Sequence, residues 1–393
     1  MKIVIAVDSF KGSLSSLEAG EAVKTGILNV IPDAKVEVCP IADGGEGTVD
    51  TLVTGMGGKL EKVEVTGPLG EKVICNYGIV ESNEQQIKEL SKLSTKTAII
   101  EMSGAAGIML VPEEKRNPLN TTTYGVGEVI RDAISKGCKH FIIGIGGSAT
   151  NDGGIGMLQA LGYGILDKDG NQVPFGAKGL EKIESVTDDK IVPELKECTF
   201  QIACDVKNPL CGELGCSAIF GPQKGANQEM IAKMNQWLLQ YADITTKNYK
   251  NVNPNQEGAG AAGGLGFAFM AYLNAKLEPG MKIVFENTDL ESKIKNADIV
   301  ITGEGKLDSQ TILGKVPVGV AEISKRYNKP VIALAGMVTE EAAICNKYGI
   351  DAIFSIQQEI QTLKEAMNPA KAKKNITFTA EQIFRLIHRV EKK

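Results

Sequence analysis

Residues 2–18 read KIVIAVDSFKGSLSSLE, and this stretch carries the clearest fold signal of the chain. Its first part, Lys2–Val7, is a nearly continuous apolar run, which is typical of a strand buried on both faces of a parallel sheet. A polar turn follows. Ser15 and Glu18 then form a capping box, which predicts a helix from about Ser15 to Val30. A buried strand that leads through a turn into a helix is the repeating unit of an open α/β sheet.

The same pattern returns near the C-terminus. A helix is predicted over residues 317–327, and a final amphipathic helix is predicted to begin at Thr379, because Thr379 and Gln382 form a second capping box. The lysine-rich residues 371–374 are interpreted as a solvated linker. Further strands are predicted at Lys35–Ile41, Asp298–Thr302, Val331–Ala335 and Ala352–Ser355. The two ends of the chain, residues 1–65 plus 288–393, are therefore predicted to form one Rossmann-like (flavodoxin-like) parallel-sheet domain of α/β class.

The middle of the chain follows a different pattern. Residues 61–65 and 72–80 predict an antiparallel hairpin, and residues 164–175 predict a second one. The uncharged run 258–275 begins with many glycines, so it is predicted to be a loop that leads into a buried helix rather than a membrane span. Further strands are predicted at Thr97–Met102, His140–Ile145 and Thr199–Asp205. Residues 66–287 are predicted to form a large mixed α/β domain that is inserted into the first.

The composition argues against several classes of protein. The chain of 393 residues has 43 Lys and Arg against 48 Asp and Glu, and its net charge of −5 disfavours nucleic acid and anionic membranes as partners. With two His, and no CxxC among eight Cys, the chain is poorly supplied for zinc sites and for Ser-His chemistry. The apolar run at the start is too short for a signal peptide, so we expect a cytoplasmic protein with reduced thiols.

Glycine is over-represented, with 44 residues, and it gathers beside acids and hydroxyl groups. Backbone N–H groups in such clusters can approach an anion closely, and neighbouring carboxylates suit Mg²⁺ or the activation of a hydroxyl group. A single cluster is more often a tight turn than a site, but several in one chain predict a phosphate or nucleotide site. The clusters are Asp8–Ser13, Asp43–Thr48, Gly144–Gly154, Gly258–Gly266 and Thr302–Asp308.

Two other functions stay open at this point. Gly258, Gly260 and Gly263 match the dinucleotide-binding fingerprint, which would suit a nicotinamide-dependent hydroxyacid dehydrogenase, although no strand is predicted before them. A non-catalytic protein that binds a small acid is the second. The P-loop motif of many ATP-binding enzymes is absent from the sequence. Lys224, which follows a Phe-Gly-Pro-Gln run, is interpreted as a lysine of a surface loop.

Seven segments together resemble the motif set of the type-1 bacterial glycerate kinases, in the same order and spacing from about residue 1 to 337. They are the five clusters above, the last one extended to Gln310, together with Cys204–Leu210 and Phe220–Ala226. The resemblance implies ATP- and Mg²⁺-dependent phosphorylation of D-glycerate, with 2-phosphoglycerate as the product in the better-known members. It also implies a Rossmann-like domain with an inserted mixed α/β domain.

Phosphoryl transfer needs positioning and charge rather than histidine, and this assigns roles within the clusters. Lys11 is expected to hold the glycerate carboxylate or the transferring phosphoryl group, and Asp43 or Asp205 is expected to orient the attacking hydroxyl. The substrate-binding residues are expected to be Asp8, Ser9, Lys11, Ser13, Gly44, Gly45, Lys207 and Asn208.

ATP and Mg²⁺ are the expected cofactors. Two glycine-rich loops are expected to bind the ATP phosphates through Gly144, Gly146, Gly147, Ser148, Thr150, Asp152, Gly258, Gly260, Gly263 and Gly264. Mg²⁺ is expected on Glu46, Glu304 and Asp308, directly or through water. D-glycerate and ATP are the expected small-molecule partners, with neither nucleic acid nor a membrane, and a homo-oligomer is left open.

Overall fold

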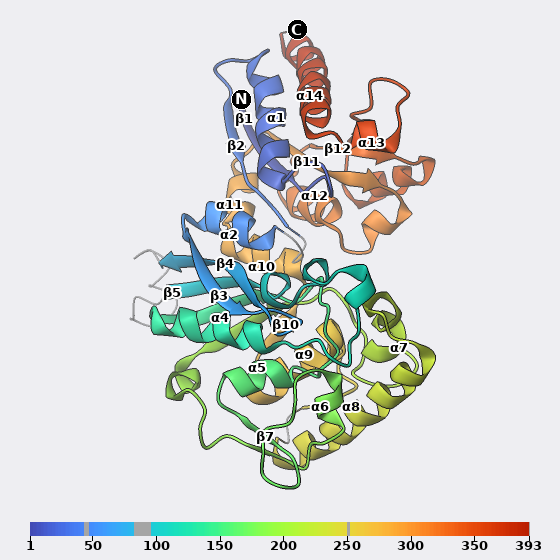
Figure 1. Cartoon of the computed structure of the whole chain (residues 1–393). Helices are drawn as coiled ribbons and strands as arrows, with labels where there is room; N and C mark the ends of the chain where they lie inside the picture. Colours follow the sequence, from blue (N-terminus) through green and yellow to red (C-terminus); the bar gives the residue numbers. More distant parts are fainter. Residues whose placement is uncertain (43–46, 82–95, 250–251, 393) are drawn as a thin grey trace. The chain divides into compact units, whose positions relative to one another are not determined.

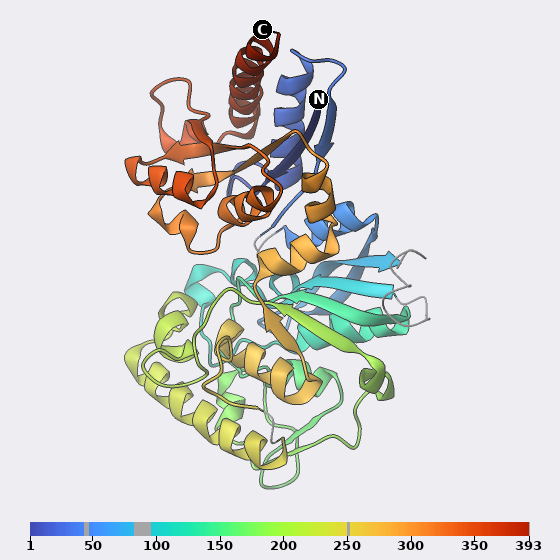
Figure 2. The ribbon, with the colours of Figure 1, turned by 180° about the vertical axis from the view of Figure 1, so that it is seen from behind.

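The computed structural model describes residues 1–42, 47–81, 96–249 and 252–392, so the predicted site residues Asp43, Gly44, Gly45 and Glu46 lie outside the described residues. The chain forms two compact units (Figures 1 and 2). The first contains the described residues within 1–43, 54–56 and 281–393, and the second those within 44–53 and 57–280. The predicted domain boundaries, near 66 and 287, stay a prediction, and each unit is described by itself.

The first unit is built on a parallel sheet with the strand order β13-β12-β11-β1-β2. Read from β2 to β13, with the five strands numbered in chain order within the unit, the order is 2-1-3-4-5. This order is typical of flavodoxin-like sheets. The strands are β1 (Lys2–Val7), β2 (Lys35–Val38), β11 (Ile299–Leu307), β12 (Val331–Val338) and β13 (Ala352–Ser355). The predicted parallel α/β sheet is confirmed.

Helices cover both faces of this sheet. Ile3, Ile5 and Val7 face one core, which they share with α1 (Ser16–Leu28) and α14 (Pro369–Glu391). These two helices lie side by side in Figures 1 and 2 and pack against each other. Because alternate strand residues point to opposite faces, the remaining strand residues face the other layer. That layer contains α12 (Val316–Arg326), which contacts β1, β11 and β12.

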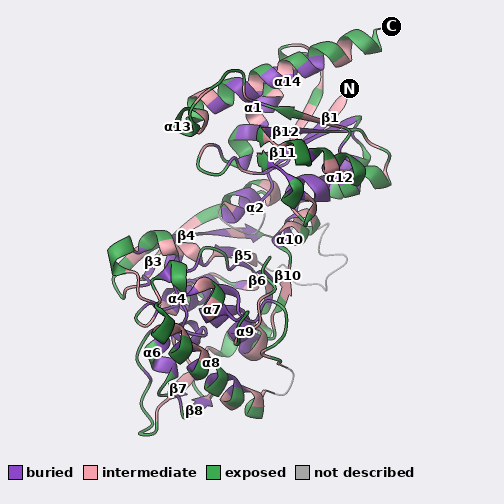
Figure 3. Ribbon diagram, turned by 90° about the vertical axis from the view of Figure 1, so that its right-hand side faces the viewer, coloured by how far each residue is buried: buried purple, intermediate pink, exposed green. Residues whose placement is uncertain are grey.

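The capping box at the start of α1 is confirmed, because the Glu18 N–H donates to Ser15 Oγ and the Ser15 N–H donates to Glu18 Oε2. The predicted start of the last helix is wrong. Helix α14 begins at Pro369, capped by the Asn368 side chain, so residues 371–374 are helical and Thr379 lies buried inside the helix. The helix begins early because its buried face already starts at Ala372, and buried residues recur between exposed ones from there to Phe384. Figure 3 shows this mixed colouring of α14.

Strand β11 is longer than predicted. The sequence places its end at Thr302, but β12 pairs with it as far as Leu307, opposite Val338. Pairing with β1 ends earlier, at Gly303. The residues from Gly303 to Lys306 are therefore strand rather than loop, and those after Gly303 extend beyond the end of β1.

The second unit contains a mixed sheet with the strand order β10-β9-β6-β5-β4-β3. Strands β10, β9, β6 and β5 run parallel, and β4 pairs antiparallel with both β5 and β3. The predicted β3–β4 hairpin is confirmed. The strands are β3 (Lys59–Thr66), β4 (Lys72–Glu81), β5 (Lys96–Glu101), β6 (Cys138–Gly144), β9 (Thr199–Ala203) and β10 (Lys276–Glu278).

The second predicted hairpin is confirmed in part, because the Val173 N–H donates to the Ile165 carbonyl and the Asp167 N–H to the Asn171 carbonyl, both at 2.9 Å, but the longer strand pairing is with another segment. Strand β7 (Gly164–Leu166) pairs with β8 (Ser185–Thr187), which places Ile165 opposite Val186. Within the predicted hairpin, Leu166 forms an isolated bridge with Gln172. The apolar partner for Ile165 is therefore supplied by a more distant strand, which a local turn signal does not reveal.

The helices of the second unit surround a large core. Helix α9 (Ala261–Leu273) is buried along almost its whole length, as predicted for a loop that leads into a buried helix. The second unit also contains the helices α3 (Ser103–Ala106), α4 (Tyr124–Ser135), α5 (Ile155–Ala160), α6 (Ala177–Leu180), α7 (Cys216–Phe220) and α8 (Gln228–Asn248). The remaining α-helices of the described residues are α2 (Thr48–Met56), α10 (Gly280–Asn287), α11 (Leu290–Lys295) and α13 (Leu363–Ala366). The 3₁₀ helices within the described ranges are η2 (Ile108–Leu110), η3 (Glu113–Lys115), η4 (Pro193–Glu197), η5 (Pro222–Lys224), η6 (Ser309–Ile312) and η7 (Glu340–Tyr348).

The eight cysteines all lie within the described ranges and form no disulfide. Across the same ranges, no helix has the length and apolar character that crossing a membrane requires.

Candidate functional site

The strand order of the first unit defines a switch point between β1 and β11, because β2 lies on one side of β1 and β11 on the other. Open α/β sheets bind ligands at such a point, outside the carboxyl ends of the strands. Asp8 follows β1 and donates its N–H to the Gly303 carbonyl at 2.8 Å. A Cβ atom built on Gly305 would lie 3.7 Å from the Lys11 backbone N. The predicted residues after β1 and the end of β11 therefore lie at the same edge.

The turn after β1 is held by its apolar residues. Phe10 and Leu14 are buried and are joined by backbone hydrogen bonds in both directions, while Lys11 between them is exposed. The Ser9 N–H donates to Asp8 Oδ1 at 2.6 Å. Ser13 Oγ is buried, and no hydrogen-bond partner for it lies in the described part of the chain. The turn thus presents an exposed lysine at the switch point and contains one buried hydroxyl group, that of Ser13.

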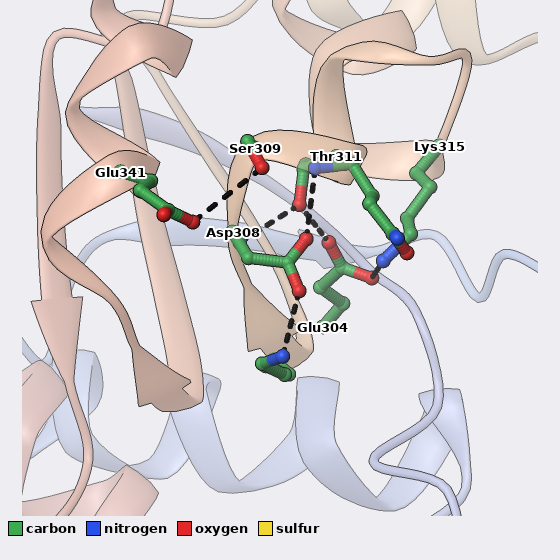
Figure 4. Close-up of polar contacts among 8 residues, drawn as sticks. Glu304, Asp308, Ser309, Thr311, Lys315 and Glu341 are labelled. Atoms are coloured by element: carbon green, nitrogen blue, oxygen red, sulfur yellow. Dashed lines mark hydrogen bonds and ion pairs between the residues drawn. The ribbon is translucent and has the colours of Figure 1, made fainter.

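Glu304 lies near this edge with only 8% of its surface exposed. Thr311 Oγ1 donates to its Oε1 at 2.7 Å and Lys315 Nζ donates to its Oε2 at 3.3 Å, and both side chains converge on Glu304 in Figure 4. Burial raises the pKa of Glu304 above its usual range, although these two partners oppose the shift. The carboxylate is therefore held in place by a hydroxyl and an ammonium group.

Asp308 belongs to the same cluster. Its Oδ1 caps η6 by accepting the Gln310 N–H at 2.9 Å, and its Oδ2 forms an ion pair of 2.8 Å with Lys306 Nζ. The hydrogen bond from Lys306 is the largest cause of a lowered pKa of Asp308. Thr311 Oγ1 joins the two acids, because it accepts the Asp308 N–H and donates to Glu304. Two carboxylates and two lysines thus form one network at the end of β11.

The donor set of this network fits Mg²⁺ in part. Mg²⁺ is usually held by one or two carboxylates together with phosphate oxygens and water, and Glu304 and Asp308 supply two carboxylates. Among the described residues, no group of three or more His, Cys, Asp or Glu could hold a metal ion. An ion at Glu304 and Asp308 would have to compete with Lys315 and Lys306, or displace them. The assignment of these acids as metal ligands stays a prediction.

The second unit brings together three predicted segments that are far apart in sequence. The loop 144–154 follows β6, and the Gly153 N–H donates to the Gly263 carbonyl at 2.9 Å. The Gly260 N–H donates to the Asn208 carbonyl, also at 2.9 Å. The segments 144–154, 204–210 and 258–266 therefore form one contiguous cluster of loops.

Several predicted glycines are required by this packing. Gly263 has φ +68° and its Cβ position would overlap the Thr150 carbonyl oxygen, while Gly264 has φ +95° and its Cβ position lies 2.8 Å from Gly153 Cα. A side chain at either position would be strained and would collide with backbone. The described residues before Gly258, from 252 onward, contain no strand. The structure thus lacks the strand that a dinucleotide-binding fingerprint requires there.

Burial divides the loop 144–154 into two parts. Gly146 and Gly147 are exposed, whereas Ser148, Thr150 and Asp152 are buried. The loop is thus exposed to solvent at Gly146 and Gly147, and its residues from Ser148 onward are buried in the protein.

Asp152 anchors the inner part of this loop. Its Oδ2 accepts the N–H and the hydroxyl of Thr123, both at 2.9 Å, and its Oδ1 accepts the Gly154 N–H at 3.1 Å. Burial raises the pKa of Asp152, and these hydrogen bonds oppose the shift. In this position Asp152 orders the loop from inside, and its predicted contact with ATP stays a prediction.

The other predicted residues of this unit lie nearer the surface. Asp205 is exposed, and its Oδ1 accepts the Gly280 N–H at 3.1 Å. Lys207 is exposed and forms an ion pair of 3.3 Å with Glu257. The Asn208 side chain donates to the Leu214 carbonyl at 2.8 Å. Asp205 and Lys207 are therefore accessible, but both already have protein partners.

The interpretation of Lys224 as a surface-loop lysine is wrong. Lys224 is 2% exposed, and its Nζ donates to Ser148 Oγ at 2.8 Å and to the Thr150 carbonyl at 2.6 Å. Burial lowers its pKa to about 8, with Cys216 and Asp152 opposing the shift. The available sequence signal was that Lys224 lies in a tight turn between Pro222 and Gly225, within one of the resembling motifs.

The buried ammonium predicts a specific pH dependence of stability. Between pH 8 and 10.5 the unfolded chain keeps the Lys224 proton and the folded chain loses it, so the stability contributed by this residue rises with pH across that window. The free energy of unfolding of the wild type, relative to Lys224→Met, should increase by about 3 kcal/mol from pH 7.5 to pH 10.5. Urea unfolding of both proteins at these pH values measures the difference. A difference that does not change with pH would show that Lys224 is not buried as an ammonium.

Over most of its length the chain is similar to known proteins. The family model described as the glycerate kinase family matches residues 3–388. Glycerate 2-kinase from Escherichia coli strain K12 is 46% identical over 384 residues, which cover 96% of this chain and 98% of that protein. Glycerate kinase from Haemophilus influenzae is also 46% identical, over 98% of this chain and 99% of its own. The crystal structure of a Salmonella typhimurium LT2 protein, assigned the name glycerate kinase 2, has a TM-score of 0.88 and 45% identity over the whole of both chains.

Proposed function

The chain belongs to the glycerate kinase family, and from this premise we propose that it transfers the γ-phosphoryl group of ATP to D-glycerate and forms 2-phosphoglycerate. The observation that supports the proposal most is the cluster at the switch point of the first unit. There Lys11 is exposed after β1, and Gly305 of β11, which lies between Glu304 and Asp308, approaches the Lys11 backbone N. Phosphoryl transfer requires this combination of positive charge and carboxylates.

We assign the substrate side of the reaction to the residues after β1. Lys11 binds the glycerate carboxylate or the phosphoryl group in transfer, and Asp8, Ser9 and Ser13 contribute oxygen atoms and N–H groups to the same turn. The turn is preorganised by Phe10 and Leu14, so binding does not require its backbone to reorder. Asp205, or Asp43, accepts a hydrogen bond from the attacking hydroxyl group and orients it.

We assign the donor side to carboxylates and glycine-rich loops. Glu304 and Asp308 hold Mg²⁺, which when bound neutralises charge on the β- and γ-phosphates. The loop 144–154 presents exposed backbone at Gly146 and Gly147, where N–H groups can meet phosphate oxygens. The loop 258–266 supports it from behind, because Gly263 contacts Thr150. A cytoplasmic location and the inserted arrangement of residues 66–287 are part of the same proposal.

The purified protein is expected to release ADP only when ATP, Mg²⁺ and D-glycerate are all present. Omission of D-glycerate, chelation of Mg²⁺ and replacement by L-glycerate are the three controls. Phosphorus NMR of the product distinguishes 2-phosphoglycerate from 3-phosphoglycerate by the coupling of the phosphorus to one or two carbon-bound protons. Absence of glycerate-dependent ADP release at every Mg²⁺ concentration would exclude the proposal, and a 3-phosphate would correct its product.

A further inference from the structure

Lys224 is a buried cation that forms no ion pair with any described residue. Its Nζ has two hydrogen-bond acceptors, the Ser148 hydroxyl at 2.8 Å and the Thr150 carbonyl at 2.6 Å, and both are uncharged. Among the described residues, none forms an ion pair with Lys224 within 4.0 Å. Removing an ammonium group from water without a paired charge costs several kcal/mol. Such a residue is therefore a candidate for a role that folding alone does not explain.

The fold places this lysine rigidly. Lys224 ends the 3₁₀ turn η5, which begins at Pro222, and the Lys224 N–H donates to the Gly221 carbonyl at 3.0 Å. Gly225 follows with φ +90°, and its Cβ position would overlap the Arg116 carbonyl oxygen, so the turn is packed closely against that segment. The side chain has little freedom to leave its position beneath residues 148–150.

The groups around the ammonium include one acid, one thiol and two oxygen atoms without a hydrogen-bond partner in the described chain. The two titratable groups that face Lys224 are Asp152 and Cys216. Asp152 is already bound by Thr123 and Gly154, and burial raises the pKa of the Cys216 thiol to about 11, so this thiol stays neutral. Thr150 Oγ1 and Asn151 Oδ1 are also buried and lack a hydrogen-bond partner within the described chain. The site is thus polar, with one ammonium group facing one acid, and its hydrogen-bonding capacity is incompletely used.

The hydrogen bond to Ser148 connects the buried ammonium to the exposed part of the loop 144–154. A hydroxyl group has one proton to donate, and Ser148 Oγ uses a lone pair to accept the proton of Lys224. Its own O–H is therefore left to donate elsewhere, and the neighbouring ammonium strengthens it as a donor. Ser148 directly follows Gly146 and Gly147, whose backbone is exposed.

We propose that Lys224 is a positioning residue of the phosphoryl-donor site, which orients Ser148 as a hydrogen-bond donor and fixes residues 148–150 for the phosphate chain of a nucleoside triphosphate. This inference rests on the proposed ATP-dependent function. Lys224 does not need to touch the nucleotide, because it acts through Ser148 and the Thr150 carbonyl.

The test compares Lys224→Met and Lys224→Arg with the wild type and with Lys233→Met, an exposed lysine of α8 that serves as a matched control. Calorimetry measures ATP binding without glycerate, and steady-state kinetics measure KM for each substrate. Lys224→Met should weaken ATP binding by about 10-fold or more, the effect of losing a charge-assisted hydrogen bond, with KM for D-glycerate within about twofold. Ser148→Ala should show the same selective loss.

The pH profile separates positioning from mere packing. In the wild type, kcat/KM for ATP should fall as the pH rises through about 8, because Lys224 loses its proton there. Lys224→Arg keeps its charge and should retain kcat/KM for ATP above that pH. An unchanged affinity of Lys224→Met for ATP, or an equal rise of both KM values, would overturn the inference. If Lys224→Met does not fold, Lys224→Arg and Ser148→Ala decide it.

The result for the wild type distinguishes the proposed kinase function from the proposed role of Lys224. If the wild type releases ADP in the presence of glycerate and the variants bind ATP as tightly as the wild type, the role of Lys224 is rejected. The kinase function is then unaffected. A wild type that neither binds nor consumes ATP would reject both.

Discussion

Replacing Lys11 with methionine is expected to lower kcat for D-glycerate phosphorylation by about 100-fold or more, the effect of removing one preorganised charge from a transition state. Lys11 is exposed at the carboxyl end of β1, at the switch point of the sheet, and it precedes the N-terminus of α1. The positive end of that helix dipole adds to the same field. Methionine is unbranched like lysine and only one heavy atom shorter, and it removes the charge.

Two controls accompany this variant. Lys24→Met, in α1, removes a lysine of the same unit and should leave kcat unchanged. Lys11→Arg retains the charge and should recover part of the activity. The free energy of unfolding of Lys11→Met should stay within about 1 kcal/mol of the wild type, because the charge is at the surface. Wild-type kcat and KM in Lys11→Met would assign Lys11 to a solvated loop without a catalytic role.

Replacing Gly263 with alanine is expected to lower the free energy of unfolding of the second unit by at least about 3 kcal/mol. Two costs combine at this position. Its φ of +68° is unfavourable for any residue with a Cβ, and the added Cβ would overlap the Thr150 carbonyl and lie 2.5 Å from Asn151 Cα. Both neighbours are backbone atoms of a buried loop, so they cannot move aside without moving that loop.

Gly170 supplies the matched control. It has a similar φ of +78°, but a Cβ atom there would meet nothing within 4 Å. Gly170→Ala should therefore show the backbone cost alone, about 1–2 kcal/mol. Urea unfolding can be followed through Trp237, the single tryptophan, which packs in the core of the second unit. Equal destabilisation by the two substitutions would mean that the close approach of Gly263 to Thr150 adds nothing to the loss of unfolding free energy.

Local signals predicted most of the secondary structure correctly. The apolar run of β1, the capping box of Ser15 and Glu18, and the β3–β4 hairpin each depend on residues within a few positions of one another. The glycine-acid clusters were also visible locally, and the structure brings those after β1 and at the end of β11 to one edge. For Asp43, Gly44, Gly45 and Glu46 the predicted roles lie outside the described residues and stay predictions.

The errors arose where a distant partner outweighed a local signal. Thr379 carries a capping-box pattern, yet packing against α1 extends α14 back to Pro369, and a hydrogen bond from Gln358 occupies the Thr379 hydroxyl. Strand β11 continues past Thr302 because β12 pairs with its backbone. In both cases burial and hydrogen bonding to another element contribute more free energy than the local preference that they override.

By itself, the amino-acid sequence determined the alternation of buried strands and helices, the positions of the turns, and the residue types available for phosphate, carboxylate and metal chemistry. These properties follow from periodicity and from short-range hydrogen bonding. Only the tertiary structure decided the order of the strands, the meeting of the loops 144–154 and 258–266, and the burial of Lys224 against Ser148, 76 positions earlier in the chain. The physical reason is that burial of a side chain and the shift of its pKa depend on all atoms packed around it, and most of those atoms belong to residues remote in sequence.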